Sequence, residues 1–254
     1  MWPVSIFDAF LLALAGLGAG LAGSIAGLAS LISYPALLAV GLAPVAANVT
    51  NTVALVFSGV GSVLGSRPEL RGESARLRQL APAAVSGGIV GGVLLLSTPA
   101  EAFELIVPWL IGVASLAILL RPAAPSLGET AHHPVSSNRL LVGVFLVGIY
   151  GGYFGAAAGV ILLALLLTAT GETLARSNAL KNAVLGMANG IAALGFIIFG
   201  PVQWLAVLPL SLGFLAGGRL GPIVVRRSPA GLLRGVIAVA GVAVALRLGF
   251  EAYS

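Results

Sequence analysis

Apolar segments follow one another along the whole chain, separated by short connectors that are polar or rich in proline and glycine. They lie at about 5–22, 23–40, 44–65, 80–97 and 102–120, and then at about 139–154, 155–170, 177–199, 202–224 and 231–250. Most approach the roughly 20 apolar residues that a membrane-spanning helix needs. The pattern predicts an all-α, polytopic membrane protein. Its domains are a first repeat at 1–120, a connector at 121–138 and a second repeat at 139–254.

The two halves resemble each other in sequence. "GLGAGLAGSIAG" (16–27) lines up with "GIYGGYFGAAAG" (148–159), with glycine shared at the first, fifth, eighth and twelfth places. Further along, "GLAPVAANVTNT" (41–52) parallels "GETLARSNALKN" (171–182). Such recurrence at matching intervals indicates an internal duplication.

Charged residues suggest that the repeats are inverted. The connector 66–79 carries four arginines, whereas its counterpart 200–203 carries no charge. Conversely, 97–104 holds only acidic charges, while its counterpart 224–229 holds two arginines. The positive-inside rule then places equivalent loops on opposite sides of the cytoplasmic membrane and both termini outside. Inversion needs an odd number of crossings in each half.

The Gly-rich segments that open each half leave two arrangements possible. They span only about 16 to 18 residues each, at or below the usual length for a crossing. Ten full spans and six spans with two re-entrant hairpins have the same parity, so both agree with the charge pattern.

Composition excludes several classes of protein. With 59% hydrophobic and 8% charged residues and a mean hydropathy of +1.09, the chain cannot be a soluble domain. The net charge of +5 comes from arginines in connectors, which argues against a nucleic-acid partner. There is no cysteine, and His132 and His133 lie in the polar connector, so no metal or cofactor is expected. The first segment has Asp8 in place of a positive n-region, so we interpret it as a retained helix.

The clustered glycines are candidate helix breaks. The residues predicted to break their helices are Gly18, Gly20 and Gly23 in the first half and Gly151, Gly152 and Gly155 in the second. A broken membrane helix offers exposed N–H groups, which attract anions. Ser24 could add a hydroxyl donor there.

Two matched polar faces are candidate substrate-binding sites. Asn48, Asn51 and Thr52 have the spacing i, i+3, i+4, and so do Asn178, Lys181 and Asn182, so each set forms one face of a helix. One reading is that the amides join helices and that Lys181 extends to the cytoplasmic surface. The other is that both faces line a polar cavity, with Lys181 as its fixed cation.

Few carboxylates lie within the apolar segments, where a buried catalytic or proton-relay group would have to be. All but Asp8 lie in or beside connectors or in the first turn of a helix. No buried acid pair is available for general acid–base catalysis, so an enzyme is not expected. A positive, amide-rich path favours an anion over a cation or proton.

Together, "GLGAGLAGSIAGLASLISYPALLAVGLAP" (16–44) and "AANVTNTVAL" (46–55), both repeated at 148–185, resemble the TauE/SafE family of sulfite exporters and related anion permeases. The resemblance implies a duplicated helical transporter in the cytoplasmic membrane of a bacterium or archaeon, linked to sulfite, sulfonates or similar oxyanions. Two features depart from the family pattern. "GLGAG" (16–20) replaces a motif closer to G-x-G-G-G, and "ISYP" (32–35) has no proline counterpart at 164–167.

These observations predict a secondary transporter of small anions, such as sulfite or organosulfonates, whose partners are that anion and the lipid bilayer. The alternatives are a passive anion channel and a membrane assembly protein without transport. The sequence does not determine the exact substrate, the direction of transport, the coupling ion or the oligomeric state.

Overall fold

The computed structural model describes residues 5–119 and 136–227, and every regular element among them is a helix. The first half contains α1 (Ile6–Ala26), α2 (Ser30–Ala39), α3 (Pro44–Gly65), α4 (Arg67–Leu70), α5 (Ser74–Ser97) and α6 (Ala100–Leu119). The second half contains α7 (Ser137–Tyr153), α8 (Ala158–Thr170), α9 (Leu174–Phe199) and α10 (Trp204–Arg227). The expected segment 231–250 and nearly all of the connector 121–138 lie outside the described residues.

Helix termini follow local capping rules. Ser5 and Asp8 form a capping box at the start of α1, with the Ser5 Oγ accepting from the Asp8 N–H at 3.1 Å. Asp8, the one carboxylate within an apolar segment, therefore caps a helix. Pro44 begins α3, a position where its missing N–H costs nothing. Thr173 caps α9 in the same manner as Ser5 caps α1.

Five of the described helices are long and apolar enough to cross a membrane: α1, α3, α5, α9 and α10. Large apolar side chains are also exposed on the outside of the bundle. They include Ile198, Phe199 and Leu208, each more than 60% exposed. Such a surface is stable in lipid and would aggregate in water. The chain is a multi-pass helical membrane protein, as its composition predicted.

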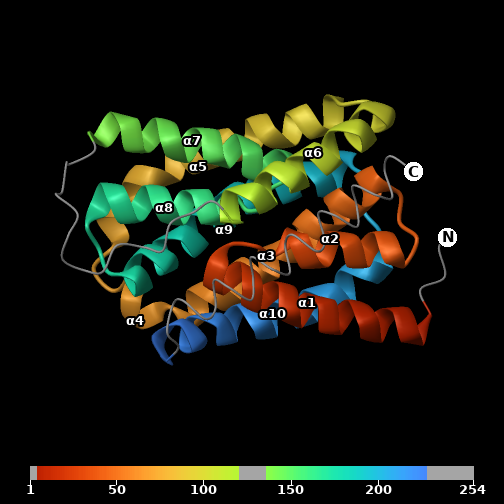
Figure 1. The fold of residues 1–254 in the computed structure, drawn as a ribbon, viewed down its shortest axis with the longest axis horizontal. Coiled ribbons are helices and arrows are strands. Elements are labelled where there is room, and N and C mark those ends of the chain that lie inside the picture. The colour runs from red at the N-terminus through yellow and green to blue at the C-terminus, as the bar shows by residue number, and fades with distance from the viewer. Residues whose placement is uncertain (1–4, 120–135, 228–254) are drawn as a thin grey trace.

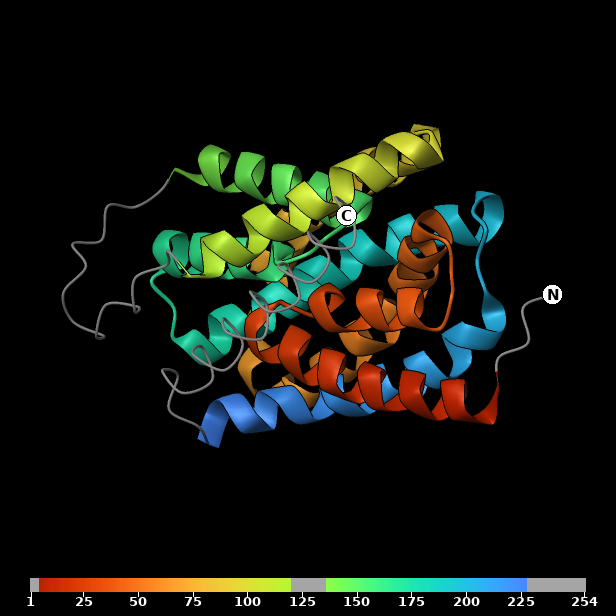
Figure 2. The ribbon, with the colours of Figure 1, turned by 45° about the vertical axis from the view of Figure 1, so that its right-hand side comes forward.

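Each half opens with a helical hairpin. Figure 1 shows that the α1–α2 hairpin opens toward the end of the bundle near the N-terminus, whereas the α7–α8 hairpin opens toward the opposite end. Figure 2 shows the same arrangement after a turn of the bundle. With 10 and 13 residues, α2 and α8 are too short to cross a bilayer. The fold therefore favours hairpins over ten full spans.

Only one of the six predicted helix breaks lies at a hairpin turn. Gly18, Gly20 and Gly23 lie inside the continuous helix α1, and Gly151 and Gly152 lie inside α7. Those five predicted breaks are wrong, because the helices continue through them. Gly20 and Gly152 lie against the backbones of Gly218 and Gly88, a close approach that glycine permits between membrane helices.

The breaks occur at Gly27 and Gly155, with φ of 80° and 73°. Of the predicted break residues, Gly155 alone lies at a turn. A residue with a Cβ would be strained in this left-handed conformation. The two tips meet, since a Cβ on Gly27 would overlap the backbone of Gly159.

The main helix–helix contacts join the two halves of the chain. Helix α1 packs along α10, α7 packs along α5, and α3 crosses α9 at the centre. Glycines at matching positions make matching contacts: Gly87 lies against the carbonyl of Phe145, and Gly213 lies against that of Ala13. Corresponding helices of the two halves run in opposite directions in Figure 1. Inversion with respect to a membrane stays a prediction.

An ion network joins the halves at the end of the bundle that carries α4, which we call the α4 end. Arg76 contacts Glu73 at 2.9 Å and Glu172 at 3.2 Å, and Arg176 contacts the same two carboxylates at 3.6 and 3.4 Å. Arg226 adds a pair with Glu69 at 2.8 Å. Arginines of both halves thus lie at the same end of the bundle, and its location on the cytoplasmic side of the membrane stays a prediction.

Replacing Glu73 with glutamine should lower the stability of the folded protein by about 1 kcal/mol, because both arginines keep Glu172 and are partly exposed. The melting temperature in detergent at low and high salt measures this, with the larger difference from wild type at low salt. Glu101→Gln, at an exposed acid on α6, is the control. Equal shifts in both variants would contradict a contribution from the network.

Candidate functional site

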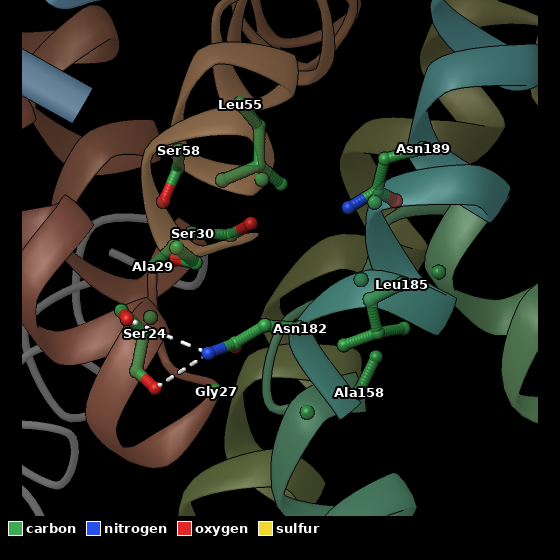
Figure 3. Close-up of a pocket in the computed structure, with 17 residues that line it drawn as sticks. Ser24, Gly27, Ala29, Ser30, Leu55, Ser58, Ala158, Asn182, Leu185 and Asn189 are labelled. Atoms are coloured by element: carbon green, nitrogen blue, oxygen red, sulfur yellow. Dashed lines mark hydrogen bonds between the residues drawn. The ribbon is translucent and has the colours of Figure 1, made fainter. Parts of the chain in front are cut away.

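A cavity lies where the two hairpin tips meet, between α3 and α9 (Figure 3). Its empty volume is about 520 Å³, part of it open to the surroundings. Its lining residues come from both halves. From the first half these are Gly23, Ser24, Gly27, Ala29, Ser30, Leu55, Ser58, Gly59 and Ser62, and from the second Gly151, Gly155, Ala158, Gly159, Asn182, Leu185, Gly186 and Asn189.

Two helix N-termini open on this cavity. Ser30 is the first residue of α2, and Ala158 and Gly159 are the first two of α8; all three line the cavity. The backbone N–H groups of Ser30, Leu31 and Gly159 have no acceptor in the described part of the chain. Unpaired N–H groups at a helix start, together with the positive end of the helix dipole, form an anion-binding element.

The polar side chains of the cavity are hydroxyls and amides. They are Ser24, Ser30, Ser58, Ser62, Asn182 and Asn189. In Figure 3, Asn182 reaches from α9 toward Ser24 on α1, and its Nδ2 donates to the Ser24 carbonyl at 3.1 Å. None of the described lining residues carries a charge. The cavity therefore offers donors to a ligand without a fixed negative group that would repel an anion.

Lys181 lies directly behind the cavity wall. Its side chain is 0% exposed, and its Nζ donates to the carbonyls of Gly23 at 3.0 Å and Ser24 at 3.2 Å. Both of these residues line the cavity. Extension of Lys181 to the cytoplasmic surface is therefore wrong, because the side chain turns inward to the C-terminal end of α1, where the helix dipole is negative.

The carbonyls that Lys181 contacts do not depend on it for hydrogen bonds. The Gly23 carbonyl also accepts from the Gly27 N–H at 2.7 Å. The Ser24 carbonyl also accepts from Asn178 at 2.9 Å and from Asn182. Since each carbonyl would stay paired without the ammonium, a need for hydrogen bonds does not explain a buried lysine here.

Each polar face holds the hairpin of the other half. Asn178, Lys181 and Asn182 on α9 all bond the end of α1. On α3, the matched Asn48 donates to the Tyr153 carbonyl at the end of α7, at 2.9 Å. The amide bonds to the Ser24 and Tyr153 carbonyls pair acceptors near the ends of α1 and α7, across the two halves of the chain.

The predicted binding residues thus divide into two layers. Ser24 and Asn182 line the cavity, whereas Asn48, Asn51, Thr52, Asn178 and Lys181 are buried behind it. Asn51 donates to the Ser30 Oγ at 3.2 Å, and Thr52 donates to the Asn48 carbonyl of its own helix. Their roles in substrate binding stay predictions.

Four polar residues of the cavity were not among the predicted binding residues: Ser30, Ser58, Ser62 and Asn189. Helical spacing could have found three of them. Ser58 lies seven residues after Asn51, and Asn189 lies seven after Asn182, which continues each polar face by two turns. Ser62 follows Ser58 by one more turn. Ser30 had no such signal, because it lies on neither of the two matched polar faces.

The described residues contain no group of three or more potential metal ligands. His132 and His133 lie outside those residues. The absence of a metal and a cofactor therefore stays a prediction.

Comparison with known proteins decides the family. The family described as Sulfite exporter TauE/SafE matches residues 12–248. The chain belongs to this family.

Curated relatives of this TauE/SafE chain carry transporter names. It is 29% identical over 239 residues to the Probable membrane transporter protein ORF9 of a Sinorhizobium species, covering 91% of this chain and 88% of the relative. It is 27% identical to the Probable membrane transporter protein YfcA of Escherichia coli K12, covering 92% and 87% of the two chains. A Probable membrane transporter protein of Haemophilus influenzae is also 27% identical, covering 88% of each chain. No solved structure gives a significant match.

These matches confirm the resemblance drawn from the two repeated motifs. A TauE/SafE chain with five apolar helices of spanning length is a membrane transporter. Its cavity of hydroxyls, amides and helix N-termini lies inside that transporter fold.

Proposed function

We propose that this chain is a secondary transporter of small sulfur oxyanions, such as sulfite or organosulfonates, across the cytoplasmic membrane. One observation carries the proposal: the N-termini of two hairpin helices from opposite halves, α2 and α8, open on one cavity that has no lining charge among the described residues. Backbone N–H groups, hydroxyls and amides are the donors that the oxygens of a sulfite or sulfonate accept from.

The electrostatics support an anion as the transported species. The buried amino group of Lys181 bonds the carbonyls of Gly23 and Ser24, two residues that line the cavity, and the described residues provide no carboxylate within ion-pair distance of it. A buried ammonium without a counterion is costly. A bound anion would supply that counterion, and the ammonium would attract the anion into the cavity.

The arrangement of the hairpins supports alternating access. Each hairpin enters the bundle from a different end, and their tips meet beside the cavity. Toward the end opposite α4, Phe154 at one tip packs edge-on against Tyr34 at 5.3 Å and against Phe103 at 6.1 Å between ring centroids. At the α4 end, the ion network joins the halves. Rocking of one half against the other would open these two closures in turn.

The orientation follows from the charges. We assign the α4 end to the cytoplasm, because Arg67, Arg71, Arg76, Arg176 and Arg226 lie there. The start of α1 then faces outward.

Counterflow in proteoliposomes tests the proposed function. Labelled sulfite should accumulate in vesicles preloaded with unlabelled sulfite and not in vesicles without protein. Uncoupled anion current at high flux without exchange would identify a channel. Absence of flux with sulfite, sulfonates and other small anions would instead favour an assembly protein.

Asn182→Leu should reduce this exchange at least about tenfold, because it removes an amide that lines the cavity and bonds Ser24. Initial rates of counterflow measure the change. Asn138→Leu, at an exposed asparagine at the start of α7, is the matched control and should transport like wild type. Equal rates in all three proteins would remove Asn182 from the substrate site.

A further inference from the structure

The charges around the cavity can be summed from the elements that meet there. Two helices end at the cavity, α1 and α7, and two begin there, α2 and α8. Each helix end carries about half a unit charge, negative at the C-terminus and positive at the N-terminus. Two negative and two positive ends nearly cancel. Among the described residues at the cavity, this leaves Lys181 as the one side chain that can carry a charge, and its protonated form has no counterion there.

We infer that the cavity selects anions with a single net negative charge over divalent anions of similar size, and that Lys181 sets this preference. The inference rests on the proposed function, since it names the charge class of the oxyanion carried at the same site. A sulfonate or hydrogensulfite would neutralise the lysine, whereas sulfate would leave one negative charge buried in the membrane.

The physical reason is that the desolvation cost of an anion and its attraction to Lys181 depend differently on the charge of the anion. The cost of removing an anion from water rises with the square of its charge, so a divalent anion costs about four times as much as a monovalent one. Its attraction to a single ammonium only doubles. The attraction of the anion to the hydroxyl and amide dipoles of the wall also only doubles, because an ion–dipole energy is proportional to the charge of the ion.

Lys181 acts here as a positioning residue for charge, without touching the substrate. Its Nζ is held at 3.0 and 3.2 Å from two carbonyls and is 158 and 157 residues distant in sequence from the residues that it contacts. The fold of the two halves around each other therefore fixes the charge beside the cavity. Asn182, the next residue along α9, lines the cavity, so the charge of Lys181 lies close to any anion bound there.

Methanesulfonate and sulfate are the probes, because both are fully ionised near neutral pH and differ by one methyl group in place of a charged oxygen. Affinities are measured by calorimetry on the purified full-length protein, and uptake is measured in proteoliposomes. Methanesulfonate should bind at least about tenfold more tightly than sulfate. Equal or tighter binding of sulfate would overturn the inference and leave the proposed function intact.

Substitutions that change the charge by one unit give a second test. Lys181→Met should weaken sulfate by the square of the factor by which it weakens methanesulfonate, because each unit of charge on the anion loses the same attraction. Asn189→Lys, at a cavity-lining residue, should strengthen sulfate more than methanesulfonate, with Asn189→Gln as the neutral control. Equal factors for both anions in these variants would overturn the role of charge.

Different results would contradict the charge selection and the transport function. Counterflow of sulfite with no preference between methanesulfonate and sulfate removes only the charge selection. No binding or flux of sulfite, methanesulfonate and sulfate removes the proposed function, and the inference with it.

Discussion

Replacing Lys181 with methionine should remove nearly all anion transport while leaving the folded protein at least as stable as wild type. The two expectations differ in sign, and each follows from the surroundings of one side chain. Lys181 is fully buried and bonds only the carbonyls of Gly23 and Ser24 among the described residues.

Stability should not fall, because the substitution leaves no buried group unpaired. The Gly27 N–H still bonds the Gly23 carbonyl, and the side chains of Asn178 and Asn182 still bond that of Ser24. Methionine is flexible and has nearly the volume of lysine, so it can fill the same space. Replacement of buried charges by apolar residues of similar volume is often neutral or stabilising by about 1–4 kcal/mol.

Transport should fall because the anion loses its counterion. An anion separated from the ammonium by one carbonyl group lies on the order of 6–8 Å from it, which gives about 2–3 kcal/mol at an effective dielectric constant near 20. Binding should weaken on the order of 100-fold, since about 1.4 kcal/mol is tenfold. The hydroxyl and amide donors of the cavity wall remain in this variant, so anion binding should be weakened without being abolished.

Thermal unfolding in detergent and counterflow in proteoliposomes measure the two effects on the same preparation. Lys181→Gln, with a shorter neutral polar side chain, is the second variant and should lose transport in the same way. Wild-type transport in Lys181→Met would eliminate the lysine from the function. A large loss of stability with unchanged affinity would make it a structural residue.

Gly159→Ala should prevent the two hairpin tips from meeting and destabilise the fold by about 3 kcal/mol or more. A Cβ at Gly159 would overlap the backbone of Gly27, and backbone atoms cannot move aside as a flexible side chain can. Gly27 cannot yield easily either, because its φ of 80° already forms the turn between α1 and α2.

The matched control is Gly190→Ala, in the middle of α9. A Cβ there meets nothing within 4 Å, so alanine should stabilise the helix by about 0.5–1 kcal/mol. Thermal unfolding and the monodisperse fraction after solubilisation measure both variants. Similar behaviour of Gly159→Ala and Gly190→Ala would show that the tips do not touch.

The sequence predicted the membrane-spanning helices of this protein well. Segment 44–65 coincides with α3, and 102–120 agrees with α6 to within two residues. Such agreement is expected, since every backbone polar group in a bilayer must bond within its own helix. The paired asparagines of α3 and α9 were also readable, because a duplicated chain repeats its polar faces at matching positions.

Local sequence could not place the helix breaks. The Gly-rich stretch 16–27 contains several glycines with the same permissive chemistry, yet the chain turns only at Gly27. Gly16 and Gly20 instead allow α10 to approach α1, as at Gly20, which lies against the backbone of Gly218. The packing partner decides which role a glycine has, and that partner lies almost two hundred residues away.

The position of Lys181 shows the same division. The sequence by itself determined a membrane protein of two similar helical halves, with a lone lysine on a polar face of α9. Only the tertiary structure decided that this lysine turns inward to the carbonyls of Gly23 and Ser24 instead of outward to the surface. The physical reason is that a lysine side chain is long enough for either course. The negative C-terminal end of α1 becomes available to it only when the two halves pack through each other.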